Sequence, residues 1–595
     1  MTRTPLRPLA SILRARADGG NPDSIERENL RRRHEADRDQ SRSRAEGRLL
    51  VLSVLFLSAF VMVGLRMSAL AASEPEEPRA TASGAGILSA RADIVDRKGR
   101  ILATNFTTHA LYAQPPLMVD KARAARELAR VFPDLDEDRL LKDFTGGRKF
   151  LWIKKRISPE QQQAVHDIGD PGLLFGPRDM RLYPNGPIAA HVLGGAGFGR
   201  EGVASAEIVG RAGIEAALDR ELRDPGRGSE PLRLTLDLSV QAAVERVLLG
   251  GMKMMNAKGA AAVLMEADTG EIVSLVSLPD FDPNHRPPAV RMADPADSPL
   301  FNRAVQGVYE LGSTFKIFAA AQAMEEGIYA PSSMIDTEGP LTWGRHRIRD
   351  LRNYGDELSL LDVIVKSSNI GTARVALEIG QEKQQDFLRR LGFFAPTSIE
   401  MVEAKQAQPL LPPNWSEIST MTVSYGHGLS ASPLHLATAY ASLLNGGHGV
   451  TPTLIAGQGR PGERIVSDRT SARAREMLRQ VVTRGTATLA EVEGYEVGGK
   501  TGTADKPKPT GGYWDEKVIA TFAGVFPASD PKYVIVVTLD EPEDTTGEEP
   551  RRTAGWTAVP VAAEVIRRAA PLLGLAPDVE PALPLGLEMA ANDGG

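Results

Sequence analysis

The order of elements in the chain predicts an α+β fold, in which helices cover the faces of an antiparallel sheet. A strand at 232–236 leads into a helix at 239–249 whose apolar residues recur at helical spacing. Two apolar strands follow, at 260–266 and 271–277, joined by the turn Asp268-Thr269-Gly270. This succession of strand, helix and hairpin starts a domain built around a sheet.

The remainder of that domain alternates in the same way. Long helices are expected from 313 to about 447. Strands return at 518–526 and 533–539, on either side of the turn 527–531. A closing helix at 561–570 is preceded by a proline that suits its first turn. The second pair of strands can complete one sheet with the first.

The composition of the 595-residue chain excludes several functional classes. Apolar residues make up 42% and charged residues 25%, so ordinary cores can form. The 70 basic and 76 acidic residues argue against a nucleic-acid-binding protein, which usually carries a strongly basic domain. The absence of cysteine excludes disulfides, thiolate zinc sites, iron–sulfur clusters and cysteine nucleophiles. The nine histidines form no His-Glu-x-x-His motif, and we expect neither a metal nor a cofactor.

The N-terminus predicts a membrane anchor. Residues 1–48 hold 12 arginines and 8 acidic residues with poor apolar periodicity, and we expect a mostly disordered cytoplasmic tail, either solvated or in contact with a partner. Residues 49–65 are uncharged, and a span of 49–70 is long enough to cross a bilayer. Basic residues precede it and acidic residues follow, which predicts a cytoplasmic N-terminus. A cleaved signal peptide ending near Ala69-Leu70-Ala71 is the alternative.

Four further segments follow the span. A Pro/Ala/Gly/Glu-rich linker is expected at 71–86, and a domain of mixed short strands and helices at 87–230. The sheet domain described above occupies 231–575. Residues 576–595 are rich in Pro, Ala and Gly, which predicts a disordered tail.

The first candidate for chemistry is a serine three residues before a lysine. Ser313 and Lys316 follow Gly312 and open a stretch of good helix formers. Positions i and i+3 share one face of a helix, as a serine nucleophile with a neutral lysine base requires. The helix N-terminus would also offer N–H groups to a developing oxyanion. Alone the motif is weak, because about one chance occurrence is expected in a chain of this length.

Two further motifs make coincidence a poor explanation. Ser367-Ser368-Asn369 follows an apolar helical stretch and by itself suits a helix terminus or cap. Lys500-Thr501-Gly502-Thr503 by itself suits a surface turn before the last two strands. In this order, Ser-x-x-Lys, Ser-x-Asn and Lys-Thr-Gly form the signature set of penicillin-binding proteins and serine β-lactamases.

The resemblance extends over about 87–575. The stretch from Arg91 to Ala103 resembles the opening motif of the periplasmic pedestal of class B penicillin-binding proteins, with Ala92 where glycine is usual. Arg181-Leu182-Tyr183-Pro184 and Gly213-Ile214-Glu215 resemble later motifs of that pedestal, also called the dimerisation-type domain. Leu311 stands where proline is common. With its single anchor and short tail, the chain is most similar to the cell-division (FtsI) type, penicillin-binding protein 3 in many Gram-negative bacteria.

This resemblance implies a transpeptidase fold with an all-helical subdomain, and a peptidoglycan D,D-transpeptidase that makes 4→3 cross-links. It assigns catalytic roles to Ser313, Lys316, Ser367, Asn369 and Lys500, and substrate binding to Thr501, Gly502 and Thr503. Ser313 would attack the penultimate D-Ala carbonyl, with Lys316 as its base and Ser367 as a proton relay. The backbone amides of Ser313 and Thr503 would form the oxyanion hole. β-Lactams would acylate the same serine.

Two features near these motifs have more than one interpretation. His427, between two glycines, is either structural or catalytic. Tyr513 and Trp514 either anchor a loop or line the substrate groove after the Lys-Thr-Gly strand.

Other functions use the same motifs. A class A enzyme would carry a glycosyltransferase motif, which we do not find. A β-lactamase or penicillin sensor would not need the pedestal and anchor. A relic scaffold would not need an intact catalytic set. An elongation-type class B enzyme is the alternative that the pedestal does not exclude.

The resemblance also implies a location and partners. The catalytic domain would lie in the periplasm, anchored in the inner membrane at the division septum. The expected partners are peptidoglycan stem peptides and lipid-linked glycan, the glycan polymerase FtsW, and the division proteins FtsQ, FtsL, FtsB and FtsN. No nucleic-acid partner is expected.

Overall fold

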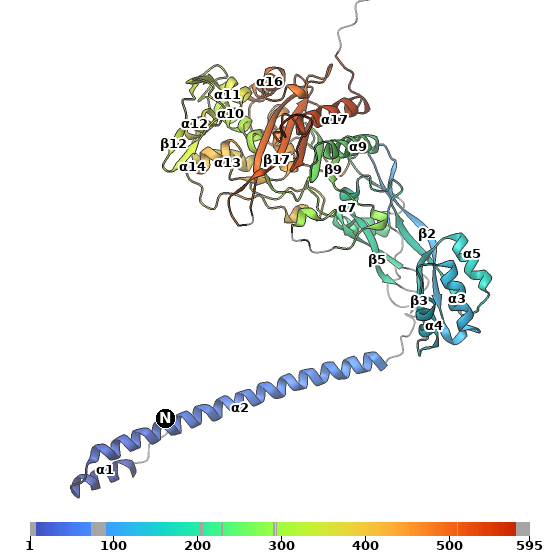
Figure 1. Ribbon diagram of the computed structural model, residues 1–595, viewed down its shortest axis with the longest axis vertical. Coiled ribbons are helices and arrows are strands. Elements are labelled where there is room, and N and C mark those ends of the chain that lie inside the picture. The colour runs from blue at the N-terminus through green and yellow to red at the C-terminus, as the bar shows by residue number, and fades with distance from the viewer. Residues whose placement is uncertain are drawn as a thin grey trace, which may run out of the picture. The chain divides into compact units, whose positions relative to one another are not determined.

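The computed structural model describes residues 7–72, 91–201, 206–227, 230–289, 292, 294–508 and 510–578 (Figure 1). The chain divides into two compact units. One holds the described parts of 1–79 together with 112–153 and 163–174, and the other holds the described remainder. Most of the expected linker, 73–86, and most of the expected C-terminal tail, 579–595, lie outside the described residues.

The N-terminal region is helical, which corrects our expectation of a mostly disordered tail. Helix α1 (Arg7–Ala17) is followed by the 51-residue helix α2 (Pro22–Ala72). The polar half of α2 is rich in helix formers and has an i,i+4 ion pair, Arg31 to Glu35 at 3.1 Å. It also continues a long apolar helix, so it needs no nucleus of its own. Glu46–Leu65 is apolar and long enough to cross a membrane, which fits a single-pass anchor.

The unit that contains the N-terminal helices also holds a small group of helices. Helix α3 (Lys121–Val131) begins at Asp120, whose side chain accepts a hydrogen bond from the Arg123 amide. Helix α4 (Glu137–Thr145) begins in the same way at Asp136. Both acidic caps also suit the positive end of a helix dipole.

The region after the anchor is built from short strands and short helices. Its main sheet has the order β3-β2-β1-β7, and β4 also pairs with β2. The strands of this region are β1 (Ile94–Val95), β2 (Ile101–Ala113), β3 (Leu151–Ile157), β4 (Leu173–Leu182), β5 (Gly195–Glu201), β6 (Ala206–Ala212) and β7 (Leu232–Arg233). Its short helices are α5 (Pro159–Ile168), α6 (Ala190–Leu193), α7 (Gly213–Ala217) and α8 (Asp219–Leu222).

A buried ionic group stabilises this region. The Glu215 side chain is fully buried, and its two oxygens accept hydrogen bonds from Arg91 and Arg181, each at 2.7 Å. The Arg91 guanidinium also donates to Asp219 at 2.7 Å. Because buried charges need well-placed partners, removing this carboxylate would be costly. The group joins parts of the chain that lie more than 100 residues apart.

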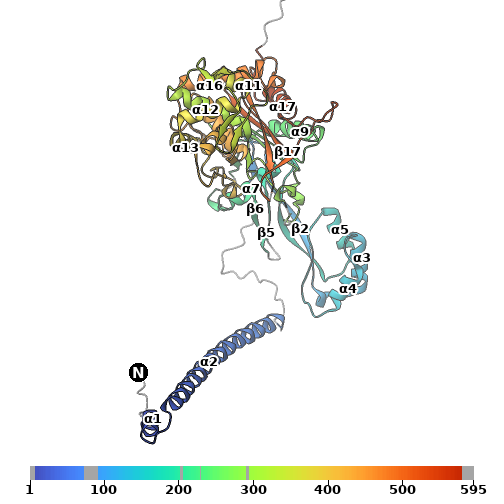
Figure 2. The same ribbon diagram turned by 60° about the vertical axis from the view of Figure 1, so that its left-hand side comes forward.

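The C-terminal domain confirms the predicted α+β architecture. Its antiparallel sheet has the order β16-β17-β18-β8-β9. The strands are β8 (Gly259–Glu266), β9 (Ile272–Leu278), β16 (Gly498–Pro507), β17 (Tyr513–Phe526) and β18 (Tyr533–Asp540). Helices α9 (Leu238–Met254) and α17 (Ala558–Leu572) pack together on one side of the sheet, and α16 (Asp468–Arg484) lies on the other (Figures 1 and 2).

The block from 313 to 447 differs from the expected run of long helices. Its helices are α10 (Lys316–Glu325), α11 (Leu360–Lys366), α12 (Asn369–Ile379), α13 (Gln381–Arg390), α14 (Glu417–Ser424) and α15 (Pro433–Leu444). Two short strand pairs interrupt them between α10 and α11: β11 (Met334–Asp336) with β14 (Glu357–Ser359), and β12 (Leu341–Trp343) with β13 (His346–Ile348). Strand β15 (Ser430–Ala431), between α14 and α15, pairs with β10 (Tyr309–Glu310), which lies before the block. Gly339-Pro340 and Gly344 break the helical pattern in this stretch.

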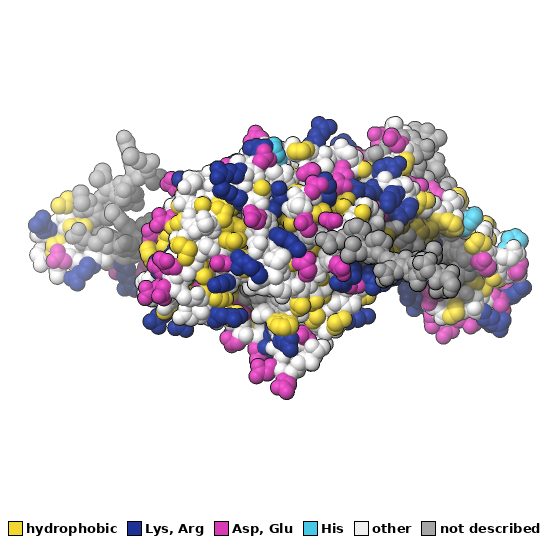
Figure 3. Space-filling model, turned by 90° about the horizontal axis from the view of Figure 1, so that it is seen from above, with side chains coloured by type: hydrophobic (Ala, Val, Ile, Leu, Met, Phe, Trp, Pro, Cys, Tyr) yellow, Lys and Arg dark blue, Asp and Glu magenta, His cyan; other side chains and the backbone are white. Residues whose placement is uncertain are grey.

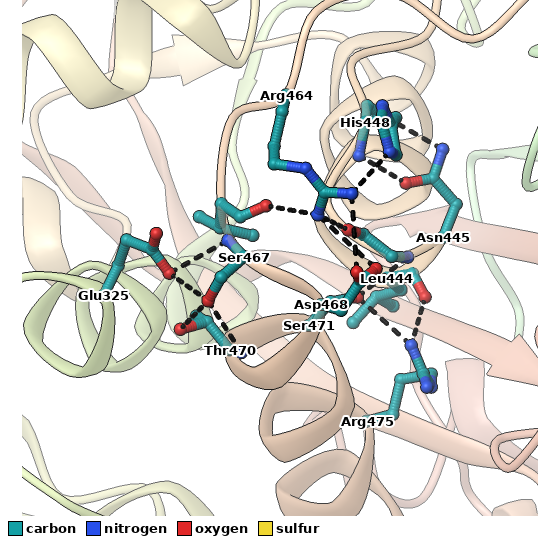
Figure 4. Close-up of polar contacts among 12 residues, drawn as sticks. Glu325, Leu444, Asn445, His448, Arg464, Ser467, Asp468, Thr470, Ser471 and Arg475 are labelled. Atoms are coloured by element: carbon teal, nitrogen blue, oxygen red, sulfur yellow. Dashed lines mark hydrogen bonds and ion pairs between the residues drawn. The ribbon is translucent and has the colours of Figure 1, made fainter.

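Helix α10 lies in the core, where its residues from Lys316 to Met324 are all buried. Its last residue, Glu325, contacts Ser467, the residue that caps the N-terminus of α16 (Figure 4). The Glu325 carboxylate accepts hydrogen bonds from the Ser467 amide at 3.0 Å and the Ser467 hydroxyl at 2.7 Å. Since α16 packs on β16, this contact links the far end of α10 to the helix behind the edge strand.

Acidic and basic side chains are interspersed on the face of the molecule drawn in Figure 3. This distribution agrees with the near balance of 70 basic and 76 acidic residues.

Candidate active site

The first catalytic motif forms a tight turn instead of a regular helix start. Ser313 lies in a 3-10 turn (Gly312–Phe315), and α10 begins at Lys316. Gly312 has φ of +57°, and a Cβ there would stand 2.8 Å from the Thr503 carbonyl oxygen. Only glycine suits both this conformation and this close approach. Ser313 is partly exposed, whereas the Lys316 side chain is fully buried.

The Lys316 amine faces the second motif. Its Nζ donates to the Ser367 carbonyl oxygen at 2.5 Å, to the Ser367 hydroxyl at 3.1 Å and to Asn369 Oδ1 at 2.7 Å. Burial holds the pKa of Lys316 well below its usual value, and the nearby charge of Lys500 lowers it further, against an opposing effect of Asp350. The site therefore favours a neutral amine at position 316.

The Lys500 amine approaches the same hydroxyl from strand β16. Its Nζ lies 3.0 Å from the Ser367 hydroxyl oxygen and 3.3 Å from the Thr501 carbonyl oxygen. Burial lowers the pKa of Lys500 to about 7. The Ser367 hydroxyl thus bridges two buried lysine amines, so a proton can pass between them through a single oxygen.

The Ser367 backbone is held in the left-handed region, with φ of 64° and ψ of 44°. This conformation costs free energy in a non-glycine residue and persists only when the surrounding structure fixes it. It ends α11 and turns the chain, so that Ser368 becomes the N-cap of α12. The turn directs both the hydroxyl and the carbonyl oxygen of Ser367 toward Lys316.

Asp350 fixes this turn, and our sequence analysis did not identify it. Its carboxylate accepts hydrogen bonds from the Ser368 hydroxyl at 2.6 Å, from the Asn369 amide, and from the Ile370 amide at 3.1 Å. The negative charge also lies at the positive end of α12. Asp350 stands in a loop with no recognisable motif, so only the fold could place it here.

The structure brings four of the five predicted catalytic side chains into one hydrogen-bonded group: Lys316, Ser367, Asn369 and Lys500. Ser313 lies one turn before Lys316, and its hydroxyl makes no hydrogen bond to any residue that the structure describes. Catalytic hydrogen bonds are often long in unliganded enzymes and shorten when substrate binds.

The predicted substrate-binding residues lie on β16, the edge strand of the sheet. The Thr501 hydroxyl lies 2.7 Å from the Thr486 hydroxyl, and the Thr503 hydroxyl accepts a hydrogen bond from the Ala554 amide at 3.0 Å. A Cβ at Gly502 would stand 2.2 Å from the Leu311 carbonyl oxygen, so only glycine allows the strand to lie this close to the nucleophile turn. An edge strand can pair with an extended peptide.

Two of the three residues whose roles were open, His427 and Tyr513, contact the carboxylate of Glu310. His427 Nδ1 lies 3.1 Å from Glu310 Oε2, and the Tyr513 hydroxyl lies 2.9 Å from Oε1. This contact favours an anchoring role for Tyr513. The Trp514 ring is approached by two lysine amines, at 5.3 and 5.4 Å. Among the described residues, no three His, Asp or Glu side chains gather as a metal site would require.

Comparison with known proteins assigns both domains. Residues 260–566 match the penicillin-binding protein transpeptidase domain, and residues 87–229 match the penicillin-binding protein dimerisation domain. The probable peptidoglycan D,D-transpeptidase FtsI of Caulobacter vibrioides is 33% identical, over 91% of this chain and 92% of that protein. Peptidoglycan D,D-transpeptidase FtsI of Escherichia coli K12 is 28% identical, over 77% and 80%.

Solved structures agree with this assignment. Penicillin-binding protein 3 of Mycobacterium tuberculosis, complexed with aztreonam, superposes with a TM-score of 0.60 at 26% identity, over 82% of this chain and 98% of that one. The same protein complexed with ampicillin gives 0.61. The chain therefore belongs to the class B penicillin-binding proteins and is a peptidoglycan D,D-transpeptidase of the FtsI cell-division type.

Proposed function

We propose that Ser313 is the nucleophile and that Lys316 is its general base. The observation that supports this most directly is the pair of buried amines, Lys316 and Lys500, on either side of the Ser367 hydroxyl. A serine hydroxyl is a weak nucleophile until a nearby base removes its proton. A lysine can serve as that base only when it is neutral, as burial favours here.

The hydrogen bonds of Lys316 are compatible with this role. A neutral amine has two N–H groups and one lone pair, whereas the Lys316 Nζ has three acceptors around it, two on Ser367 and one on Asn369. In the neutral form, two acceptors can be served at a time, and the lone pair is free to accept the Ser313 proton.

The acylation step then follows. Ser313 Oγ forms a bond to the carbonyl carbon of the penultimate D-Ala while Lys316 takes the hydroxyl proton. The C–N bond to the terminal D-Ala breaks, and its nitrogen receives a proton through the Ser367 hydroxyl. The Ser313 and Thr503 amides stabilise the oxyanion. An amine of a second stem peptide then attacks the ester carbonyl carbon and the bond from that carbon to Ser313 Oγ breaks. The proton that the amine loses passes through Lys316 to Ser313 Oγ, which frees the serine and completes a 4→3 cross-link.

Strand β16 would bind the substrate. The donor stem peptide would lie along this edge, with its terminal carboxylate held by Lys500 and the hydroxyls of Thr501 and Thr503, and with Gly502 allowing close approach. Asn369 would bind the donor amide. β-Lactams resemble this donor, and the matching penicillin-binding protein 3 structures are complexes with aztreonam and ampicillin.

We further propose that the enzyme acts at the division septum. The arginines before the apolar span support a cytoplasmic N-terminus and, with it, a periplasmic catalytic domain. A transpeptidase without its own polymerase needs a glycan-polymerising partner, which we expect to be FtsW, together with FtsQ, FtsL, FtsB and FtsN. Septal localisation of a tagged copy, with loss of the signal when the anchor is replaced by an unrelated span, would support this.

The test of the catalytic assignment is labelling of the membrane-anchored full chain with fluorescent penicillin. Ser313→Ala should abolish labelling, and Lys316→Met should reduce it at least about 100-fold because the base is lost. Ser332→Ala, which changes an exposed serine in the same domain, is the matched control and should label like the parent. Labelling of the Ser313→Ala variant at the parent level would refute the assignment.

A further inference from the structure

The Glu310 carboxylate joins three segments next to the nucleophile. It stands three residues before Ser313, and its Oε1 accepts hydrogen bonds from the Gly428 amide at 2.7 Å and the Tyr513 hydroxyl at 2.9 Å. Its Oε2 lies 3.1 Å from both His427 Nδ1 and the Tyr513 hydroxyl. The carboxylate thus connects strand β10 to the loop 425–428 and to the β16–β17 hairpin.

Those two segments enclose the nucleophile turn. The Gly312 amide donates to the Gly426 carbonyl oxygen at 3.2 Å. A Cβ at Gly426, where φ is +84°, would stand 1.9 Å from the Gly312 carbonyl oxygen. On the other side, the Thr503 carbonyl oxygen would lie 2.8 Å from a Cβ at Gly312. The turn therefore lies in direct contact with loop 425–428 on one side and strand β16 on the other.

Glu310 is ionised in this environment. Burial alone would raise its pKa, but hydrogen bonds from His427, Gly428 and Tyr513 lower the pKa below its usual value. An ionised carboxylate only accepts hydrogen bonds, so all three neighbours must donate, and the His427 proton toward Glu310 lies on Nδ1. Such charge-assisted bonds are stronger than neutral ones and fix the three segments tightly.

We propose that Glu310 is a positioning residue of the transpeptidase. Its carboxylate holds the turn 312–315 against loop 425–428 and strand β16, so that the Ser313 and Thr503 amides face one oxyanion. The inference rests on the proposed roles of those two residues. Glu310 therefore affects the rate of the chemical step through its contacts with the neighbouring segments. It does not affect the affinity for the ligand.

The proposal predicts a separable effect on the two stages of acylation. A misplacement of about 1 Å can slow a chemical step about 100-fold without altering the affinity of the encounter complex. Stopped-flow acylation of the detergent-solubilised full chain by a chromogenic β-lactam, over a range of drug concentrations, gives the dissociation constant Kd and the acylation rate constant k2. We expect Glu310→Gln to lower k2 about 10- to 100-fold and to leave Kd within about twofold.

The matched control is Glu516→Gln, which removes an exposed carboxylate from strand β17 of the same hairpin. Its k2 and Kd should equal those of the parent. A Glu310→Gln variant with the same k2 as this control would overturn the proposal. A raised Kd with unchanged k2 would also overturn it, because Glu310 would then contact the ligand.

A second variant keeps the test decisive if Glu310→Gln does not fold, as judged by its melting curve. Tyr513→Phe removes only the two hydrogen bonds from the half-exposed phenol and should lower k2 about threefold at unchanged Kd. An unchanged k2 in this variant would then overturn the proposal. If the parent itself forms no acyl-enzyme, the assignment of Ser313 fails first, and the inference falls with it.

Discussion

Replacing Lys500 with methionine should stabilise the fold at neutral pH and abolish acylation. The Lys500 side chain is fully buried, and burial lowers its pKa from 10.5 to about 7. In the unfolded chain the same amine is protonated up to about pH 10.4. Between pH 7 and that value the unfolded state binds one more proton, so the free energy of unfolding of the parent rises with pH.

The size of the effect follows from these two pKa values. At pH 7.5 the Lys500 amine is mostly neutral in the folded protein, whereas in the unfolded chain it is protonated, because this pH lies about three units below its pKa there. At about 1.4 kcal/mol per pH unit, giving up this proton on folding lowers the free energy of unfolding by about 4 kcal/mol. Methionine matches the length of lysine but loses the hydrogen bonds to Ser367 and Thr501, worth about 1 kcal/mol each. The variant should therefore be more stable by about 2 kcal/mol at pH 7.5, an advantage that shrinks by about 1.4 kcal/mol per pH unit and disappears near pH 9.

The assay is thermal unfolding of the detergent-solubilised protein at several pH values, with fluorescent penicillin labelling in parallel. Lys366→Met, a change at a partly exposed lysine, is the matched control and should leave the pH dependence of the parent intact. A Lys500→Met variant that is less stable than the parent at pH 7.5, or whose advantage does not change with pH, would refute the reasoning.

Three further changes test the supporting contacts. Asp350→Asn weakens the cap of α12 and should lower the free energy of unfolding by about 1–2 kcal/mol in thermal denaturation, with slower penicillin acylation. Gly312→Ala meets the Thr503 carbonyl oxygen and should slow acylation about 100-fold, whereas Gly392→Ala, also at positive φ but in open space, should not. Glu215→Gln leaves two buried guanidinium groups facing a neutral amide and should lower the free energy of unfolding by about 3 kcal/mol in denaturant titration. Unchanged acylation in the first two variants, or an unchanged unfolding curve in the third, would contradict these contacts.

The sequence predicted the sheet and the protein family well, because both depend on local patterns. The hairpin at 260–277 and the strands at 518–539 are continuous apolar runs between turn residues. The three motifs are short and ordered, so they could be recognised without knowledge of how the chain packs.

The supporting residues could not be predicted in this way. Asp350 and Glu310 bind segments that lie far from them in the sequence. The residues next to them in the sequence form no motif that would predict these contacts. The position of Ser313 in a 3-10 turn, instead of a helix, depends on contacts of Gly312 with β16. The helix over 22–48 was missed because this segment has few apolar residues at helical spacing. It forms as a continuation of the apolar helix that follows it.

The most direct test of the account is mass spectrometry of the intact protein and its peptides after reaction with a penicillin. The account predicts one adduct, with the mass of the opened β-lactam, on the peptide that contains Ser313. Formation of the adduct should slow as the pH falls and Lys316 becomes protonated. An adduct on a different residue, or no adduct on a folded protein, would contradict it.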